Sequence, residues 1–190
     1  MTTLPNIPAQ KSRARRATKA RRAVVHDAAL GLDLISQFPA AEFRGAIIGG
    51  FWPLSGEIDI RPLMRACHDA GHSLALPCTP PIGNPLIFRT WSPEDKLKVG
   101  PYDTREPFMD KDEVTPALVL MPLFAFSLDG KRLGYGGGFY DRTLAALRQA
   151  GDVFACGVAY AGQETPHIPT DAYDQPLDGI LTEQYFRKFT

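Results

Sequence analysis

The hydrophobic residues near the start of the chain recur at the spacing of a helix. Val24, Val25, Ala28, Leu32 and Ile35 are separated by intervals that place them on one apolar stripe. We therefore predict one helix over residues 11–38, weakened locally by Gly31. Residues 1–10 contain two prolines and are expected to form a loose leader.

From residue 46 onward, short apolar runs alternate with helical patterns. One helix is indicated by Ile60, Leu63, Met64 and Cys67, which share a face. This alternation predicts one α/β domain over residues 1–190, a three-layer sandwich with a mostly parallel central sheet. Residues 92–116 are polar and rich in turn formers. The predicted strands cover residues 46–51, 73–78, 85–91, 117–126, 153–160 and 179–182, and the later helices cover residues 60–70 and 140–149.

Composition narrows the class of protein. The longest apolar run, residues 117–126, is about half the length that a membrane-spanning helix needs, and no secretory signal pattern is present. Cys67, Cys78 and Cys156 form no CxxC pair, so buried structural thiols are favoured over a catalytic thiol, a zinc site or a disulfide framework. We expect a cytoplasmic protein without a membrane segment.

The charge is unevenly distributed, although the formal net charge is zero. Residues 1–26 carry seven basic groups and no acidic group, which leaves a net charge of −7 on the remainder. A basic segment on an acidic body is typical of a protein that binds an anion, such as a nucleotide, a nucleic acid or a membrane surface. A solvated basic helix face is the other interpretation that this pattern allows.

The strongest candidate for chemistry is the glycine cluster RLGYGGGFYDR at residues 132–142. It lies between a predicted strand and a predicted helix, where free backbone N–H groups can bind an anion. It lacks the Gly-Lys-Ser/Thr of a Walker A loop and the third glycine of a dinucleotide fingerprint. Arg132 can bind phosphate oxygens, and Asp141 can bind Mg²⁺, whereas a glycine cluster alone is often a plain turn.

This cluster resembles the signature of the 5-formyltetrahydrofolate cyclo-ligase family, also called methenyltetrahydrofolate synthetase. The resemblance extends over nearly the whole chain. The matching pieces, in order, are Lys11 with Arg15, the segment 56–59, Leu76-Pro77, Glu106-Pro107, Pro122 with Ala125-Phe126, Gly130, the segment 157–160 with Gln163, Pro169, and Asp174 with the segment 178–183. Departures occur at Phe139, Leu123 and Ser127, and at Asp103, where the family commonly has glycine after an aromatic residue.

The resemblance implies a fold of the type shared with sugar-phosphate isomerases and CoA transferases. It also implies ATP- and Mg²⁺-dependent closure of 5-formyltetrahydrofolate to 5,10-methenyltetrahydrofolate through a phosphorylated formyl group. It implies these site residues: Lys11, Arg15, Arg132, Gly134, Gly136, Gly137, Gly138 and Tyr140 for ATP, with Arg132 and Tyr140 catalytic; Trp52, Glu57, Tyr102, Tyr135 and Phe139 for the folate; Asp141 and Asp174 for Mg²⁺.

Some of these residues also have a purely structural interpretation. Lys11 and Arg15 lie one helical turn apart and could simply be solvated, and Trp52 could be core packing. Asp178 competes with Asp174 for the metal role. A non-catalytic relative that binds nucleotide or RNA is the alternative function. We expect small-molecule substrates, no nucleic-acid partner and a monomer.

Overall fold

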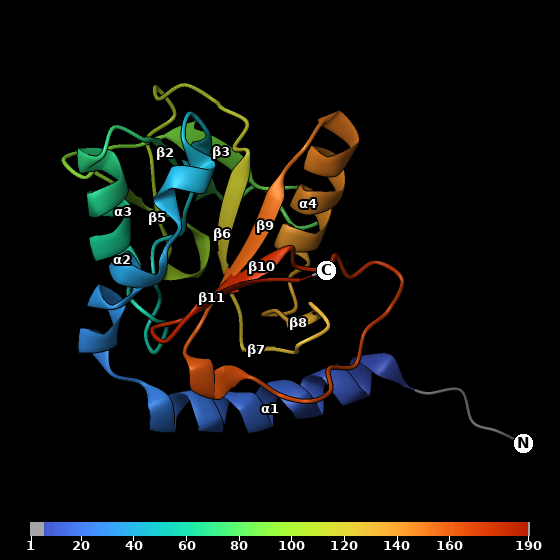
Figure 1. The fold of residues 1–190 in the computed structure, drawn as a ribbon. Helices are drawn as coiled ribbons and strands as arrows, with labels where there is room; N and C mark the ends of the chain where they lie inside the picture. Colours follow the sequence, from blue (N-terminus) through green and yellow to red (C-terminus); the bar gives the residue numbers. More distant parts are fainter. Residues whose placement is uncertain (1–5, 190) are drawn as a thin grey trace, which may run out of the picture.

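The computed structural model describes residues 6–189 and has three layers, with helices on both faces of a central sheet (Figure 1). The sheet has seven strands in the order β11-β10-β9-β6-β1-β2-β3. Its inner strands pair in parallel, and the edge strands β3 and β11 pair antiparallel to their neighbours. The prediction of an α/β sandwich with a mostly parallel sheet is confirmed. The seven strands are β1 (Ile47–Gly49), β2 (Ser73–Cys78), β3 (Ile87–Thr90), β6 (Leu118–Pro122), β9 (Phe154–Val158), β10 (Gly179–Leu181) and β11 (Phe186–Lys188).

Alternate residues of the central strands face two separate cores. Leu118 and Leu120 of β6 pack with the helices α2 (Leu34–Gln37) and α3 (Arg61–Asp69). Val119 and Met121 point to the other face, where they share a core with Leu144 of α4 (Phe139–Ala150). This period of two, buried on both sides, explains why the sequence of β6 is continuously apolar.

The N-terminal helix differs from the prediction in length and in its buried face. Helix α1 spans Ile7–Val25, and the chain then continues through the 3₁₀ helix η1 (Ala28–Leu32) into α2. The single helix predicted for residues 11–38 is therefore wrong, because His26 and Asp27 are extended at the break. The predicted apolar stripe is also wrong, since Val24 is 85%, Leu32 60% and Ile35 41% exposed. The helix begins before the predicted position; residues 1–5 of the expected leader lie outside the described residues.

Several elements are shorter than predicted or were missed. The run 117–126 is divided into β6 and β7 (Ala125–Phe126), which forms a hairpin with β8 (Arg132–Leu133). The segment predicted as irregular contains a small hairpin of β4 (Lys98–Val99) and β5 (Arg105–Glu106). Strand β11 was not predicted at all. The remaining 3₁₀ helices are η2 (Ala40–Phe43), η3 (Pro101–Asp103) and η4 (Ala161–Gln163).

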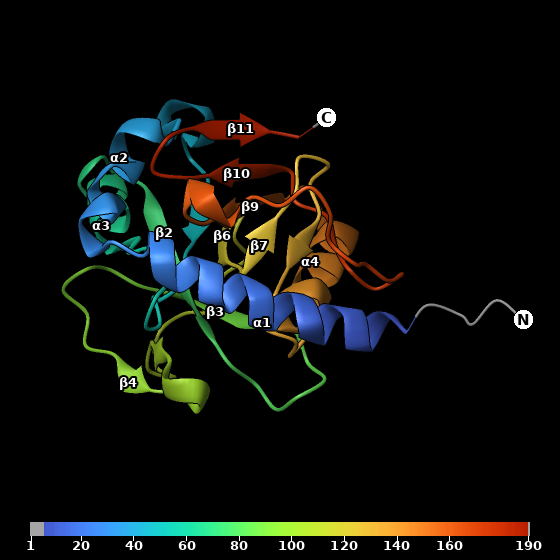
Figure 2. The ribbon, with the colours of Figure 1, turned by 90° about the horizontal axis from the view of Figure 1, so that it is seen from below.

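Helix α1 lies across one end of the sheet, over the β7–β8 hairpin (Figures 1 and 2). Its two buried residues are both polar, Thr18 and Arg22. Its apolar support comes from Ala14, which packs on a cluster that includes Leu133, and from Val25 in its last turn, which packs against the larger core. Polar contacts therefore dominate the docking of α1. Across residues 6–189, no helix combines the length and apolar character that crossing a bilayer requires.

Candidate active site

A cavity of about 320 Å³ opens where β1, β2 and β6 end. Ligands of open α/β sheets bind at the carboxyl ends of the strands, and this cavity lies in that position. Its lining joins the two halves of the predicted site. The predicted residues that line it are Trp52, Glu57, Tyr102, Arg132, Gly134, Tyr135, Gly136, Gly137, Gly138, Phe139, Tyr140 and Asp141. Lys11, Arg15 and Asp174 are not part of this lining.

The glycine loop connects β8 to α4 and needs its glycines for two reasons. Gly136 and Gly138 have φ of 101° and 67°, in the left-handed region that favours glycine. A Cβ on Gly138 would lie 2.6 Å from Nη1 of Arg142, and a Cβ on Gly136 would lie 3.2 Å from Cζ of Arg15. The loop is therefore shaped so that arginine side chains approach its backbone closely.

Arg132 and Asp141 form a buried ion pair at the amino end of α4. Arg132 Nη2 donates to Asp141 Oδ1 over 2.5 Å, and the side chains are only 4% and 23% exposed. Burial acts to lower the pKa of Arg132, while Asp141 and Asp174 act to raise it. Nε of Arg132 is buried and has no hydrogen-bond partner. A donor left without an acceptor at a cavity wall is suited to an anionic ligand.

Lys11 and Arg15 connect α1 to the same region. Lys11 Nζ donates to both oxygens of Asp174, at 2.5 and 2.7 Å, and to Asp171 at 2.8 Å. Burial acts to lower the pKa of Lys11, but these two carboxylates outweigh it and raise the pKa. Arg15 Nε donates to the Gly134 carbonyl over 2.8 Å. The two basic residues thus contact the glycine loop and the loop that carries Asp174.

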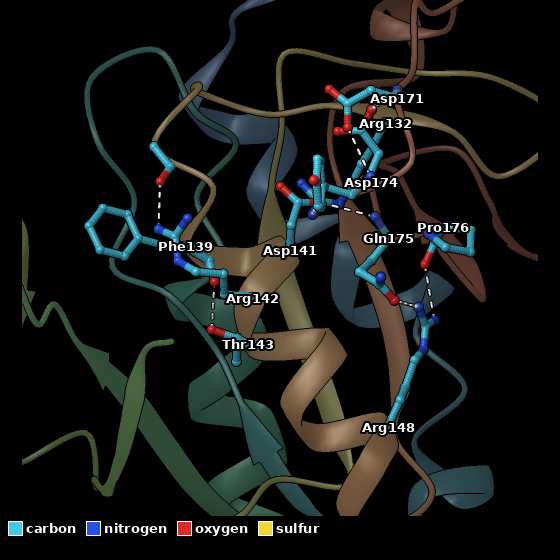
Figure 3. A network of polar contacts seen from close by, with 12 residues as sticks. Arg132, Phe139, Asp141, Arg142, Thr143, Arg148, Asp171, Asp174, Gln175 and Pro176 are labelled. Atoms are coloured by element: carbon cyan, nitrogen blue, oxygen red, sulfur yellow. Dashed lines mark hydrogen bonds and ion pairs between the residues drawn. The ribbon is translucent and has the colours of Figure 1, made fainter. Parts of the chain in front are cut away.

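The two carboxylates that the resemblance assigns to Mg²⁺ lie on hydrogen-bonded segments. Asp141 Oδ1 accepts from the amide of Gln175, the residue after Asp174, over 3.1 Å (Figure 3). Among residues 6–189 there is no group of three or more His, Cys, Asp or Glu suited to a metal. Mg²⁺ bound with a nucleotide commonly uses only one or two carboxylates besides phosphate oxygens and water, and this donor set fits that pattern.

Asp178 has a different place in the structure. Its Oδ2 accepts from the Ala155 amide at 2.7 Å and from Arg148 at 2.9 Å. These bonds join the start of β9 to the last turn of α4. Asp174 instead pairs with Lys11, whose helix also contacts the glycine loop through Arg15.

Glu57 lines the same cavity and is buried, with 7% of its surface exposed. Its Oε2 accepts from the Leu54 amide over 2.7 Å, and its Oε1 accepts from the hydroxyl of Tyr135. Burial raises the pKa of Glu57, although Tyr135, Leu54 and Arg22 act in the opposite direction. The pKa of Tyr135 is raised by burial of its hydroxyl and by Glu57, so this phenol stays a donor.

Aromatic side chains form the remaining walls. Trp52 packs edge-on to Trp91, with ring centroids 6.4 Å apart, and Arg61 lies over its ring. Tyr102, 62% exposed, contacts Phe139 edge-on at 6.2 Å. Tyr102 and Asp103 both have φ of 60°, so the position where the family commonly has glycine does take a left-handed conformation here. Flat apolar walls of this kind suit a planar ring system.

Tyr140 and the three cysteines are also singled out by the sequence. Burial, with a contribution from Glu57, raises the pKa of Tyr140, so its hydroxyl is neutral and can donate a hydrogen bond. Burial also raises the pKa of Cys67, to about 11, and of Cys156. Neither thiol lines the cavity. The interpretation as buried thiols is confirmed for Cys67 and Cys156, whereas it is wrong for Cys78, which is only half-buried.

Sequence reasoning missed two arginines that touch the site. Arg142 donates to the Gly137 carbonyl over 2.7 Å and braces the loop. Arg22 is 7% exposed and donates to the Tyr135 hydroxyl over 2.6 Å. A signal for Arg22 was present: it follows Arg15 by seven residues, which returns to the same helix face.

Comparison with known proteins shows the family to which the chain belongs. A model of the 5-formyltetrahydrofolate cyclo-ligase family matches residues 9–183. Among curated relatives, the 5-formyltetrahydrofolate cyclo-ligase of Escherichia coli K12 is 35% identical over 138 residues, which is 70% of this chain and 75% of the relative. The enzyme of that name from Haemophilus influenzae is 32% identical over 155 residues, covering 79% of this chain and 80% of the relative.

A solved structure gives the same result for the fold. The structure of 5,10-methenyltetrahydrofolate synthetase from Aquifex aeolicus superposes with a TM-score of 0.75 at 30% identity, covering 94% of this chain and 92% of that one. The expectation from the glycine cluster is therefore confirmed. The chain belongs to the 5-formyltetrahydrofolate cyclo-ligase family of enzymes.

Proposed function

We propose that this enzyme uses ATP and Mg²⁺ to convert 5-formyltetrahydrofolate to 5,10-methenyltetrahydrofolate. One observation carries the proposal. A single cavity joins an anion-suited half, made of the glycine loop, Arg132 and Asp141, to an aromatic half that contains a buried carboxylate, Glu57. Two dissimilar substrates can meet in such a cavity, and the family name describes a ring closure between groups of one of them.

The reaction needs activation of an amide oxygen. The N5-formyl oxygen forms a bond to the γ-phosphorus of ATP, the bond from that phosphorus to ADP breaks, and an imidate phosphate results. N10 then bonds to the formyl carbon, loses its proton to water, and phosphate departs with the former formyl oxygen. The protein contributes orientation and charge neutralisation rather than a nucleophile.

The proposed roles follow the positions of the side chains. Arg132, the glycine-loop amides, Lys11 and Arg15 bind phosphate oxygens, and Arg132 neutralises the transferring phosphoryl group. Tyr140 donates a hydrogen bond from its neutral hydroxyl. Glu57 accepts hydrogen bonds from the pterin N–H groups, between walls formed by Trp52, Tyr102, Tyr135 and Phe139. When bound, Mg²⁺ supplies charge neutralisation on the phosphates, and Asp141 and Asp174 would hold it.

Product absorbance tests the proposal directly. Methenyltetrahydrofolate should form when 5-formyltetrahydrofolate, ATP and Mg²⁺ are present together, and not when either nucleotide or divalent cation is left out. Equal product formation without nucleotide would overturn the mechanism. Nucleotide or RNA binding without any turnover would instead favour a non-catalytic relative.

A further inference from the structure

Arg22 is a buried cation to which the proposed reaction gives no task. It follows Arg15 by seven residues on α1, which returns to the same face of the helix. Its guanidinium sits 4.8 Å from the ring centroid of Phe124, and a Cβ on Gly56 would lie 3.6 Å from its Nη2. A buried charge is costly unless a nearby group compensates it.

The buried charge of Arg22 is compensated through the phenol of Tyr135. Arg22 Nη1 donates to the Tyr135 hydroxyl over 2.6 Å, and that hydroxyl donates in turn to Oε1 of Glu57. The described part of the chain gives Arg22 hydrogen-bond acceptors but no carboxylate in direct contact. Because an arginine can only donate, it occupies a lone pair of the phenol oxygen. The phenol proton is thereby directed to Glu57.

Arg22 also contacts the turn that carries Glu57. Its Nη2 lies 3.5 Å from the Ser55 carbonyl, within the turn that the Glu57 amide closes on the Leu54 carbonyl at 3.0 Å. Oε2 of Glu57 accepts from the Leu54 amide in the same turn. Both oxygens of Glu57 therefore already have one fixed donor each, and their second lone pairs are aimed by the same contacts.

We propose that Arg22 is a positioning residue for folate recognition: acting through Tyr135, it holds Glu57 as an oriented acceptor for the N–H groups of the pterin. This inference rests on the proposed function and goes beyond it, because it assigns α1 to both substrates. Lys11 and Arg15 serve the nucleotide, and Arg22 serves the folate.

Kinetics of matched variants test the idea. Arg22→Met should raise the KM for 5-formyltetrahydrofolate roughly 10- to 100-fold, the loss expected for a hydrogen-bond network to a charged group. The KM for ATP should stay within about twofold of its original value, because Arg22 makes none of the proposed hydrogen bonds to phosphate. Lys19→Met removes the same charge from an exposed position of the same helix and should change neither constant. Arg22→Lys, which keeps a cation there, should recover part of the loss.

A double-mutant cycle and a pH profile separate positioning from general damage. In a Tyr135→Phe background the effect of Arg22→Met should largely disappear, because the phenol is the link. The groups facing Glu57 are Arg22 from α1, Tyr135 from the glycine loop and Tyr140 from α4. Without Arg22 the carboxylate protonates more easily, so the acid limb of folate use should move to higher pH.

The outcomes distinguish this inference from the function that it assumes. Equal effects on both substrates, full additivity with Tyr135→Phe, or an unshifted acid limb would each overturn the role of Arg22 and leave the cyclo-ligase activity standing. Absence of turnover in the unaltered protein would overturn both. Calorimetric binding of nucleotide shows whether Arg22→Met is folded. If that variant does not fold, Tyr135→Phe breaks the same link to Glu57 and is measured in its place.

Discussion

Replacing Asp141 by asparagine should destabilise the protein, although the sequence alone suggests a harmless change at a helix start. In the structure Asp141 is the partner of Arg132, whose side chain is 4% exposed. The substitution keeps the shape and removes the charge. It would leave the buried guanidinium without its hydrogen-bonded carboxylate, and only the more indirect effect of Asp174 would remain.

The magnitude follows from the burial of the pair. Removing one partner of a buried ion pair costs about 3–5 kcal/mol. Asp141 is 23% exposed and the amide oxygen can still accept a hydrogen bond, so the lower end applies, about 3 kcal/mol. For a chain of this length, that free energy corresponds to a fall in Tm of roughly 6–12 °C.

Thermal unfolding followed by circular dichroism measures the effect. Glu94→Gln is the matched control, because Glu94 pairs with Arg65 at the same 2.5 Å but the side chains are 78% and 47% exposed. Exposed pairs contribute little, so its Tm should barely move. The double variant Arg132→Met with Asp141→Asn should recover much of the lost stability, since neither charge then remains buried.

The result that would refute this reasoning is a Tm for Asp141→Asn as close to the original as that of Glu94→Gln. Asp141 would then not be the counterion that stabilises Arg132 in the ligand-free protein. An increased Mg²⁺ requirement together with an unchanged Tm would leave only the metal role. A double variant less stable than Asp141→Asn would also contradict this explanation, in which the unpaired guanidinium of Arg132 causes the loss of stability.

Other variants test the remaining contacts. Lys11→Ala and Arg15→Ala should each raise the KM for ATP roughly 10- to 150-fold with little change for folate; a change confined to the folate KM would contradict the assignment. Glu57→Gln should impair folate use and spare nucleotide binding measured by calorimetry. Burial raises the pKa of Glu57, so folate use by the unaltered enzyme should decline on acidification at a higher pH than an ordinary glutamate would give, and Glu57→Gln should lack that decline. Gly138→Ala should lose about 1–2 kcal/mol, because φ is 67° and the new Cβ would meet Arg142. Gly71→Ala, with φ of 88° and open space around it, should lose similar stability but, unlike Gly138→Ala, leave the ATP KM unchanged.

Local patterns in the sequence predicted the layers of the fold well. The apolar face of α3 and the uninterrupted apolar run of β6 each reflect burial that the strand or helix period makes visible. The hairpin of β4 and β5 and strand β11 contain only two or three residues per strand, too few for any period to show. Their pairing depends on partners that local sequence does not reveal.

The site was harder to predict where its contacts join distant segments. The glycine loop and Asp141 are adjacent in sequence, so their association could be inferred. The pairing of Lys11 with Asp174 and the link from Arg22 to Glu57 bring together segments far apart along the chain. The apolar-stripe argument also failed for α1, because that helix docks through polar side chains and leaves Val24 exposed.

A helix docked mainly by polar contacts has a consequence for local opening. Segments with few buried apolar contacts detach at a lower free energy than the core, so α1 should separate from the sheet without global unfolding. Its amides should exchange hydrogen faster than those of β6 and β9, whose residues are buried except for Pro122 and Phe154 at the strand ends. Each such opening would withdraw Lys11, Arg15 and Arg22 together. Bound ATP or bound folate alone should then slow exchange along the entire helix.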